Sequence, residues 1–357
     1  MIAAALLCAF GFAAGFLLIR RVPLCPSTRS YHEIYFSIII PARNEERNLP
    51  RLLASIAASA TRPVEVLVVD DASTDNTASV AQSLGASVLR SAHPPLGWTG
   101  KSWACHQGAD RAMGDVLLFL DADTYFIPGG LDRVIAFWGC QKDRRLVVSL
   151  LPYHAMISMY EQLSLVFNLL MAAGAGGFGG IAAPKLFGQS LLIAKEMYRA
   201  AGGHAAVPGV VLENLRLADI LHNSDARILC LGGRDTLHMR MFPEGFRQMS
   251  ESWTKTLMQG AADSGPVVLT CAIIWIAAQW STVLLLIFQG DNGRLAIAVV
   301  YVLIGLQLAW NGRKLGSYSL STCLLYPLPL GYYCLVFGQS AVRRALHRKS
   351  TWRGREV

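Results

Sequence analysis

Apolar residues gather in long runs at both ends of the chain. The first 19 residues carry no charge, and Arg20 and Arg21 follow them directly. Three further apolar runs lie in the C-terminal third, at residues 265–289, 295–310 and 320–336. Runs of this kind predict helices in a bilayer, and the two arginines favour its cytoplasmic side. We expect an N-terminal transmembrane anchor at 1–19 and C-terminal membrane segments within 264–340.

Basic residues near the C-terminus predict how these segments cross the membrane. Residues 343–355 contain six Lys or Arg and no acid, so the tail, 341–357, should be cytoplasmic. The middle of the chain should lie on the same side, which requires an even number of crossings after residue 262. We therefore expect segment 320–336, with its Pro and Gly residues, to be a re-entrant or interfacial hairpin. The chain should be a multi-pass protein of the cell membrane.

The middle of the chain alternates short apolar runs with helical patterns. Residues 35–40, 64–69 and 116–120 lack polar alternation, which is typical of strands buried on both faces. Helical spacing follows the first two runs. This alternation predicts an α/β fold, a doubly wound sheet within residues 34–240 with a ligand crevice at the carboxyl edge of the strands. Further strands are expected at 87–89, 189–195 and 226–231.

Polar residues follow three of these strands, at the expected crevice. Asp121 and Asp123 come directly after the third, Asp70 and Asp71 after the second, and Glu45 soon after the first. Two carboxylates so close together are costly to desolvate unless a cation compensates them, and oxygen ligands suit Mg²⁺ or Mn²⁺ carrying a substrate diphosphate. The pattern predicts a metal site at Asp121 and Asp123 that takes a nucleotide sugar.

Two more charged residues have a catalytic and a plain interpretation. Lys101 lies in a Gly/Pro-rich loop, residues 94–105, where it could meet a phosphate or the nucleotide, or be a solvated lysine beside a packed Trp. Glu213 opens a helical pattern that runs through residue 221. It either faces a ligand or is a surface charge stabilised by the helix dipole.

Two segments have the composition of helices at a membrane surface. Residues 156–171 are strongly apolar and lead into the Gly/Ala-rich stretch 174–180. An interfacial helix with a flexible loop and a buried core helix are both open interpretations. Residues 239–262 carry an apolar stripe near helical spacing with charges on the other faces. This pattern favours an interfacial amphipathic helix at 241–263.

Composition supports a membrane protein. Hydrophobic residues make up 53% of the chain and charged residues only 16%, which is too apolar for an ordinary soluble enzyme. The eight cysteines form no Cys-x-x-Cys pair, which argues against zinc and against a disulfide framework and favours a reducing cytosol. We expect no nucleic-acid partner, and the sequence has no signal of an oligomeric state.

Four motifs occur in an order that resembles family 2 glycosyltransferases. They are Ser-Ile-Ile-Ile-Pro-Ala-Arg-Asn-Glu-Glu (37–46), Val-Val-Asp-Asp-Ala-Ser-Thr-Asp-Asn-Thr (68–77), Gly-Lys-Ser-Trp-Ala (100–104) and Leu-Asp-Ala-Asp-Thr (120–124). The loop 97–104, Gly-Gly-His at 202–204, and residues 240–246 followed by Trp253 and Lys255 resemble the membrane-bound branch of 4,4′-diaponeurosporenoate glycosyltransferases. The resemblance covers about residues 35–255 and the pattern of one membrane segment before and three after.

The resemblance implies a GT-A nucleotide-sugar fold and a role for each matching residue. The donor nucleotide would be held by a set of loop residues, with the ribose and a divalent metal on Asp121 and Asp123. Arg240, or Trp253 with Lys255, stands where relatives have a Gln-x-x-Arg-Trp motif that closes on the diphosphate and acceptor. His204, Trp253 and Lys255 are expected on the acceptor side. The expected nucleotide-sugar residues are Pro41, Arg43, Glu45, Asp70, Asp71, Lys101, Asp121 and Arg240.

The implied reaction is an inverting transfer with Asp123 and Glu213 as catalytic residues. Relatives have a Glu-Asp pair whose Asp removes the acceptor proton, and here the pair is Glu213-Asn214. Glu213 is therefore the expected base or acceptor-orienting group. We expect a UDP-sugar donor, with glucose as the sugar, and an apolar acceptor such as a carotenoid acid, another isoprenoid or a lipid. A processive polysaccharide synthase and a non-catalytic nucleotide-sugar-binding subunit are the alternatives.

Overall fold

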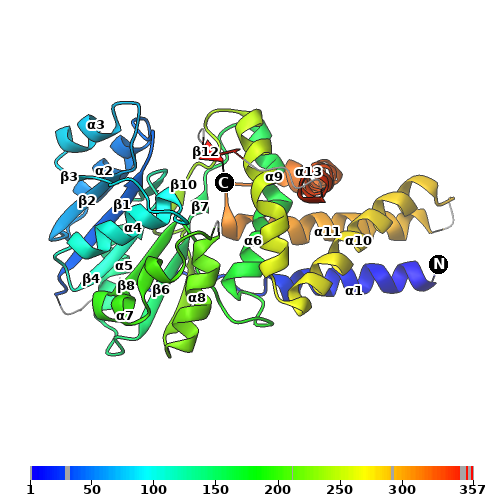
Figure 1. The fold of residues 1–357 in the computed structure, drawn as a ribbon. Helices are drawn as coiled ribbons and strands as arrows, with labels where there is room; N and C mark the ends of the chain where they lie inside the picture. Colours follow the sequence, from blue (N-terminus) through cyan, green and yellow to red (C-terminus); the bar gives the residue numbers. More distant parts are fainter. Residues whose placement is uncertain are drawn as a thin grey trace. The chain divides into compact units, whose positions relative to one another are not determined.

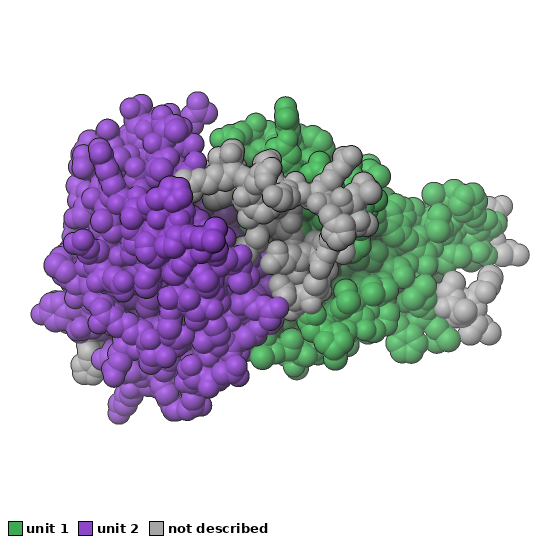
Figure 2. Space-filling view, in the orientation of Figure 1, with its two compact units in different colours: residues 1–22, 154–183, 241–356 green, residues 23–153, 184–240, 357 purple. Residues whose placement is uncertain are grey.

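The computed structural model describes residues 2–28, 33–210, 212–290, 293–345, 351–352 and 355–356 (Figure 1). The chain forms two compact units, coloured separately in Figure 2. We call them the sheet unit, Pro23–Tyr153 and Pro184–Arg240, and the helical unit, Met1–Val22, His154–Ala183 and Met241–Glu356. Residues 154–183, inside the range expected for the catalytic domain, thus belong to the helical unit.

A seven-stranded sheet lies at the centre of the sheet unit, in the order β3-β2-β1-β4-β8-β6-β9 (Figure 1). Strands β3, β2, β1 and β4 are parallel, and so are β6 and β9, but β8 is antiparallel to β4 and β6. The α/β class is confirmed, while the sheet is mixed and not purely parallel. The strands are β1 (Phe36–Ala42), β2 (Glu65–Asp70), β3 (Ser87–Arg90), β4 (Val116–Leu120), β6 (Leu146–Leu151), β8 (Ser190–Ala194) and β9 (Arg227–Gly232).

Helices cover both faces of this sheet, which explains its continuous apolar strands. Alternate residues of β1 point to opposite faces, and both Ile38 and Ile39 are fully buried. Gly108 of α4 lies against Ile39, where an added Cβ would lie 2.5 Å from Ile39 Cγ2, so glycine allows this helix to pack closely. The helices of the unit are α2 (Leu49–Ala57), α3 (Thr77–Ser83), α4 (Gly100–Arg111), α5 (Gly130–Gly139), α7 (Lys195–Ala200), η2 (Gly203–Ala206) and α8 (Glu213–Asn223).

A short second sheet has the order β5-β10-β7. Its strands are β5 (Thr124–Phe126), β10 (Leu237–Met239) and β7 (Tyr153–His154). Strand β5 begins three residues after Asp121, and in the antiparallel register Thr124 pairs with Met239. The pairing ends there, with Arg240 directly after β10 and Asp123 directly before β5 in the chain.

The helical unit contains two helices that are long and apolar enough to cross a membrane, α10 (Pro266–Phe288) and α11 (Arg294–Leu315). The third apolar run is divided into α12 (Leu320–Leu324) and α13 (Pro327–Ala345), and neither passes that test over its described residues. The N-terminal helix α1 (Ile2–Leu18) is short, with an apolar stretch over Leu6–Leu18, so a full crossing there stays a prediction. Two short strands, β11 (Thr351–Trp352) and β12 (Arg355–Glu356), pair near the C-terminus.

Helix α1 packs directly against α10 and α11. An added Cβ at Gly11 would clash with Ala278, and one at Gly15 would clash with Gln307, so these small residues let the helices approach closely. Polar groups also join the helices: Cys8 Sγ lies 3.3 Å from Thr282 Oγ1, and Gln307 Nε2 donates to Phe12 O at 2.6 Å. The N-terminal segment is therefore built into the unit and is not an isolated apolar tail.

Of the two interpretations of residues 156–171, the buried helix is right. They form η1 (Met159–Ser164) and α6 (Leu165–Gly176), and Leu165, Phe167 and Asn168 of α6 are almost completely buried. Helix α9 (Phe246–Asp263) begins later than the pattern suggested, and its stripe residues Met249 and Trp253 face protein. The interfacial position of 241–263 stays a prediction: Met249 and Trp253 are covered within the helical unit, whereas Phe246 is 48% exposed.

Candidate active site

The loops after β1 and β2 meet at the carboxyl edge of the sheet, as parallel strands require. Arg43 Nη1 donates to Asp71 O at 3.0 Å and lies 3.7 Å from the Asp71 carboxylate. Glu45 accepts a hydrogen bond from Asn48 at 2.7 Å, and its backbone N–H donates to Thr77 Oγ1 at 2.8 Å. The structure thus brings together the predicted nucleoside residues of the first two loops.

These loops hold backbone conformations that most residues avoid. Asn44 and Ala72 have φ angles of 56° and 51°, and for Ala72 the left-handed region is strained. The strained residue directly follows Asp70 and Asp71. Asp70 in turn accepts a hydrogen bond from the backbone N–H of Ser73 at 3.2 Å, which fixes the turn that presents both carboxylates.

A tight turn between β4 and β5 presents Asp121 and Asp123. The Asp121 N–H donates to Gln189 O at 3.0 Å, and the Asp121 carbonyl accepts from Thr124 N at 3.1 Å and Thr124 Oγ1 at 2.8 Å. Threonine after the second aspartate therefore has a local role, because its hydroxyl closes the turn. The two carboxylates leave the sheet from one short, hydrogen-bonded loop.

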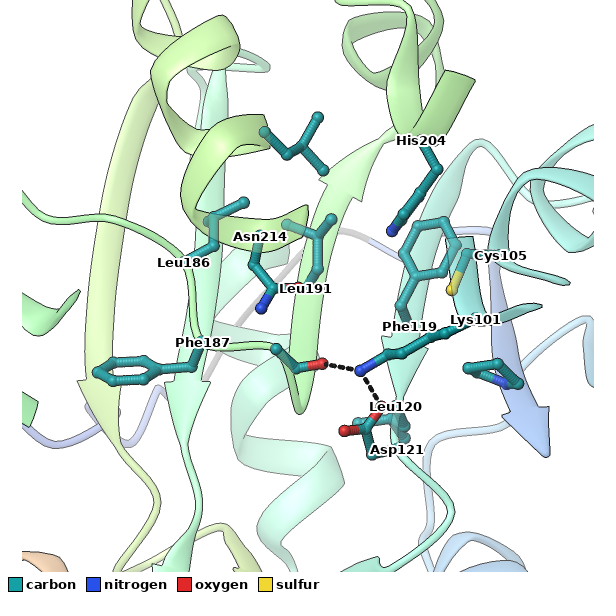
Figure 3. Close-up of a pocket in the computed structure, with 13 residues that line it drawn as sticks. Lys101, Cys105, Phe119, Leu120, Asp121, Leu186, Phe187, Leu191, His204 and Asn214 are labelled. Atoms are coloured by element: carbon teal, nitrogen blue, oxygen red, sulfur yellow. Dashed lines mark hydrogen bonds and ion pairs between the residues drawn. The ribbon is translucent and has the colours of Figure 1, made fainter. Parts of the chain in front are cut away.

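Lys101 joins this turn to the start of α8. Helix α4 begins at Gly100, where Thr99 caps it by accepting from Ser102 N at 3.3 Å. Lys101 Nζ lies 2.7 Å from Asp121 Oδ1 and 3.6 Å from Glu213 Oε1, and it donates to Gly188 O at 3.0 Å (Figure 3). The interpretation of a solvated surface lysine is therefore wrong.

Glu213 is a buried carboxylate with organised partners. It is the first residue of α8 and only 5% exposed, so it is not a solvated surface charge. The Asn214 side chain is oriented so that its amide nitrogen donates to Glu213 Oε1 at 3.0 Å. Its amide oxygen then accepts from Gly188 N at 3.1 Å. Lys101 and Asn214 thus both contact this carboxylate.

Burial and charge act in opposite directions on these groups. Burial raises the pKa of Glu213 above its usual value, and the Lys101 ammonium partly offsets this rise. For Lys101, burial alone would lower the pKa, but the Asp121 and Glu213 carboxylates outweigh it and hold the pKa above its usual range. Lys101 therefore stays charged throughout the physiological range.

The remaining predicted residues are distributed between the units. Pro41 and His204 line the same pocket as Lys101 and Asp121. Trp253 lies in the helical unit, 6% exposed, with its ring stacked on Phe167 at 4.7 Å between centroids. Lys255 falls in α9, but its side chain lies outside the described part of the chain. The acceptor-side roles of His204, Trp253 and Lys255 stay predictions.

Comparisons with known proteins identify the family. The family model described as glycosyl transferase family 2 matches residues 37–155. A 4,4′-diaponeurosporenoate glycosyltransferase from Staphylococcus aureus (strain USA300) is 31% identical over 346 residues, which covers 94% of this chain and 92% of the relative, and that of strain MRSA252 matches equally. The protein is a family 2 glycosyltransferase.

A solved structure shows that the fold is shared over nearly the whole chain. The mannosyltransferase PcManGT from Pyrobaculum calidifontis, in complex with GDP-Man and Mn²⁺, superposes with a TM-score of 0.58 at 17% identity, covering 97% of this glycosyltransferase and 99% of the other. At that identity the likeness concerns the fold. It supports the GT-A arrangement of the mixed sheet.

The donor set of this glycosyltransferase fits a divalent ion that arrives with a nucleotide. Asp121 and Asp123 supply hard oxygen ligands from one turn, which suits Mg²⁺ or Mn²⁺. Among the side chains that the structure describes, no group of three or more His, Cys, Asp or Glu could hold a metal. The two aspartates would therefore hold the ion together with donor phosphate oxygens, as magnesium sites of nucleotide enzymes do.

Sequence analysis missed Gly188 as a site residue. Its carbonyl accepts from Lys101 and its N–H donates to the Asn214 amide oxygen. An added Cβ at Gly188 would lie 2.5 Å from the terminal amide atom of Asn214 that faces it, so a side chain there would displace the amide that contacts Glu213. Its only sequence signal was a glycine just before an expected strand.

Proposed function

We propose that this glycosyltransferase moves a hexose, glucose, from a UDP-sugar to a membrane-embedded apolar acceptor that carries a carboxylate. The observation that carries the proposal is Lys101, which joins the Asp121 turn to buried Glu213 at the carboxyl edge of β4. Asp121 would belong to the turn that binds the nucleotide sugar and Glu213 would face the acceptor, so this contact supports a single site for both substrates. The relatives' name, with its carotenoid acid, supports the acceptor class.

The reaction would be a single displacement with inversion. An acceptor oxygen forms a bond to the anomeric carbon, the bond from that carbon to the diphosphate oxygen breaks, and the electron pair leaves with the nucleoside diphosphate. A divalent ion on Asp121 and Asp123 would neutralise negative charge on the leaving group. Arg43 with Asp71 and Glu45 with Thr77 hold the two loops that would bind the nucleoside.

Glu213 and Asn214 bear on the choice of acceptor. An amide at position 214 cannot accept a proton at neutral pH, so Glu213 is the remaining carboxylate of the pair. A hydroxyl acceptor, with a pKa far above 7, would need a base, whereas a carboxylate acceptor is already ionised. The loss of the usual base therefore favours an acid acceptor and a glycosyl ester as product.

We expect Glu213→Gln to lower transfer only about tenfold, less than the roughly 10²–10⁴-fold loss that removal of a general base causes. The reason is that Glu213 would orient groups without removing a proton. Transfer from UDP-glucose to a carotenoid acid in detergent or vesicles measures the rate. Mild alkali should cleave the product, because it is an ester. Asp219→Asn, on an exposed part of α8, serves as the control.

An alkali-stable glycoside together with an inactive Glu213→Gln variant would reverse this assignment. Glu213 would then be the base for a hydroxyl acceptor. Mass spectrometry of lipids extracted from cells with and without this chain would name both the sugar and the acceptor. A product that is polymeric and aqueous would instead support a polysaccharide synthase.

We also expect the basic tail and the sheet unit to lie on the cytoplasmic side. Helices α10 and α11 would cross and return, and the last turn of α11 carries Arg313 and Lys314, which favour the cytoplasmic end of that helix. The experiment is Ser350→Cys in a chain whose native cysteines are replaced by Ser. A membrane-impermeant thiol reagent should label position 350 only after the cells are opened, and labelling of intact cells would contradict this topology.

A further inference from the structure

His204 is held inside the pocket of the sheet unit by an aromatic cluster. It is 4% exposed, and its ring centroid lies 5.3 Å from that of Phe119 and 5.7 Å from that of Tyr198. It lines the pocket that also contains Lys101 and Asp121 (Figure 3). The ring therefore presents a polar edge to the same space as the charged groups of the site.

The Gly202-Gly203 turn creates this position. Both glycines have positive φ angles, 76° and 52°, and an added Cβ at Gly203 would clash with the Tyr198 ring. The close approach brings the Tyr198 hydroxyl to two atoms of the following residue. It lies 2.8 Å from His204 Nδ1 and accepts from the His204 backbone N–H at 3.0 Å.

Counting donors and acceptors assigns the proton on the imidazole. The Tyr198 oxygen already accepts from the backbone N–H, and its own hydrogen needs an acceptor, because a buried hydroxyl without one is costly. His204 Nδ1 is the acceptor within reach. A neutral imidazole that accepts at Nδ1 carries its hydrogen at Nε2. Among the described residues, Nε2–H has no hydrogen-bond partner within the protein.

The surroundings keep both groups in these states. Burial, and then the nearby Lys101 ammonium, lowers the pKa of His204 to about 3, so the ring is neutral at physiological pH. Burial also raises the pKa of Tyr198 above its usual range, so the phenol keeps its hydrogen. The pair therefore offers a fixed, uncharged N–H donor.

We propose that the Nε2–H of His204 donates a hydrogen bond to a hydroxyl oxygen of the donor sugar and so helps to select the hexose. This inference rests on the proposed function, and it replaces the acceptor-side role expected for His204 with a role at the donor sugar. Asp121 lines the same pocket as His204, so a carboxylate is present there that could accept a hydrogen bond from a sugar hydroxyl. A sugar hydroxyl is neutral, and it can accept from His204 while it donates to a carboxylate.

The same proton assignment argues against His204 as a metal ligand. A metal binds the lone pair of an imidazole nitrogen, but Nδ1 is used by Tyr198 and Nε2 carries the hydrogen. The residue therefore belongs with the groups that read the sugar and not with Asp121 and Asp123. The pocket also has an apolar wall, which includes Phe119, Leu191 and Leu217. This wall can contact the C–H groups on one face of a sugar ring.

The test compares the best nucleotide hexose with its 2-, 3-, 4- and 6-deoxy analogues, using the full chain in detergent. A neutral hydrogen bond contributes about 0.5–1.5 kcal/mol, so wild type should lose roughly three- to tenfold in donor affinity and kcat/KM with one analogue through this contact. His204→Leu should show that loss with the parent donor and no further loss with that analogue. His204→Gln, which can still donate, should retain part of the discrimination.

Two further variants separate recognition from structure. Tyr198→Phe removes the group that fixes the tautomer and should weaken discrimination at the same hydroxyl with the ring still present. His222→Gln, at the far end of α8 where the ring contacts Pro184 O at 2.8 Å, should leave discrimination unchanged. If His204→Leu loses as much donor affinity and kcat/KM with each deoxy analogue as wild type does, the inference is wrong. If wild type binds no nucleotide hexose, the proposed function itself fails.

Discussion

A chain with Asp123 replaced by Asn is expected to lose transfer activity by at least about 10³-fold while it stays folded. The substitution keeps the size of the side chain and removes one of the two carboxylates that would hold the divalent ion, whose charge stabilisation amounts to several kcal/mol. Transfer should be measured with Mg²⁺ and Mn²⁺ at saturating donor, beside thermal unfolding of the purified variant. Excess EDTA should inhibit wild type to a similar degree.

Asp110→Asn is the matched control, because its carboxylate lies on α4 and is 61% exposed. It should keep full activity. Full activity of Asp123→Asn, or wild-type activity that EDTA does not change, would show that the aspartate turn does not work through a metal. A variant that loses both activity and its unfolding transition would point to a structural role for Asp123. In this turn, the hydrogen bond from the Thr124 hydroxyl to the Asp121 carbonyl already has a structural role.

The second large effect is expected for Lys101→Met. This change leaves Asp121 and Glu213 without their shared cation, and removal of one partner from a buried ion pair costs about 3–5 kcal/mol. Because the side chains of Lys101 and Asp121 are 28% and 26% exposed, solvent screening should reduce the loss in the free energy of unfolding to about 2 kcal/mol. Transfer should fall roughly 10²-fold, since the Asp121 turn and Glu213 are no longer held together.

The pH dependence of Lys101→Met follows from the sign of the Glu213 shift. Burial raises the pKa of Glu213 and Lys101 lowers it, so the variant should have a still higher Glu213 pKa. A carboxyl whose pKa is raised in the folded state contributes stability below its unfolded value and loses it as pH rises through the folded value. The difference in the free energy of unfolding between wild type and variant should therefore increase with rising pH. The acid limb of the kcat/KM profile should shift to higher pH in the variant.

Charge-retaining and surface controls complete this test. Lys101→Arg should keep most of the stability and the position of the acid limb, although its guanidinium will fit the site less well. Lys142→Met, at an exposed position, should match wild type. A Lys101→Met variant with an unchanged pH profile would show that Lys101 does not control Glu213.

Local patterns predicted the parts of the site that lie directly after strands. The apolar run 116–120 coincides with β4, and the ends of β1 and β2 fall within two residues of the expected runs. Parallel strands place these ends at one edge, so Glu45, Asp70 and Asp121 could be assigned to one crevice from spacing alone. The β6 strand, Leu146–Leu151, was missed although it is fully buried and apolar except for Ser149.

Non-local features could not be predicted in this way. The direction of β8 depends on pairing with β4 and β6, and an apolar run has no sign of direction. The contact between Lys101 and Glu213 joins residues 112 positions apart through two helix starts. Helix α6 shows the same limit, because an apolar helix has the same pattern whether lipid or protein covers it.

The packing of α1 has a consequence for how the protein is made. Its contacts join residues far apart in the chain: Cys8 and Thr282 are separated by 274 positions, and Phe12 and Gln307 by 295. At about 5–20 residues per second, a ribosome needs roughly 15–60 s to synthesise the residues between these partners. Helix α1 must therefore wait with Gly11 and Gly15 uncovered until α10 and α11 have been synthesised. If α1 enters the bilayer, as the sequence predicts, lipid or an insertion factor would shield this face during synthesis.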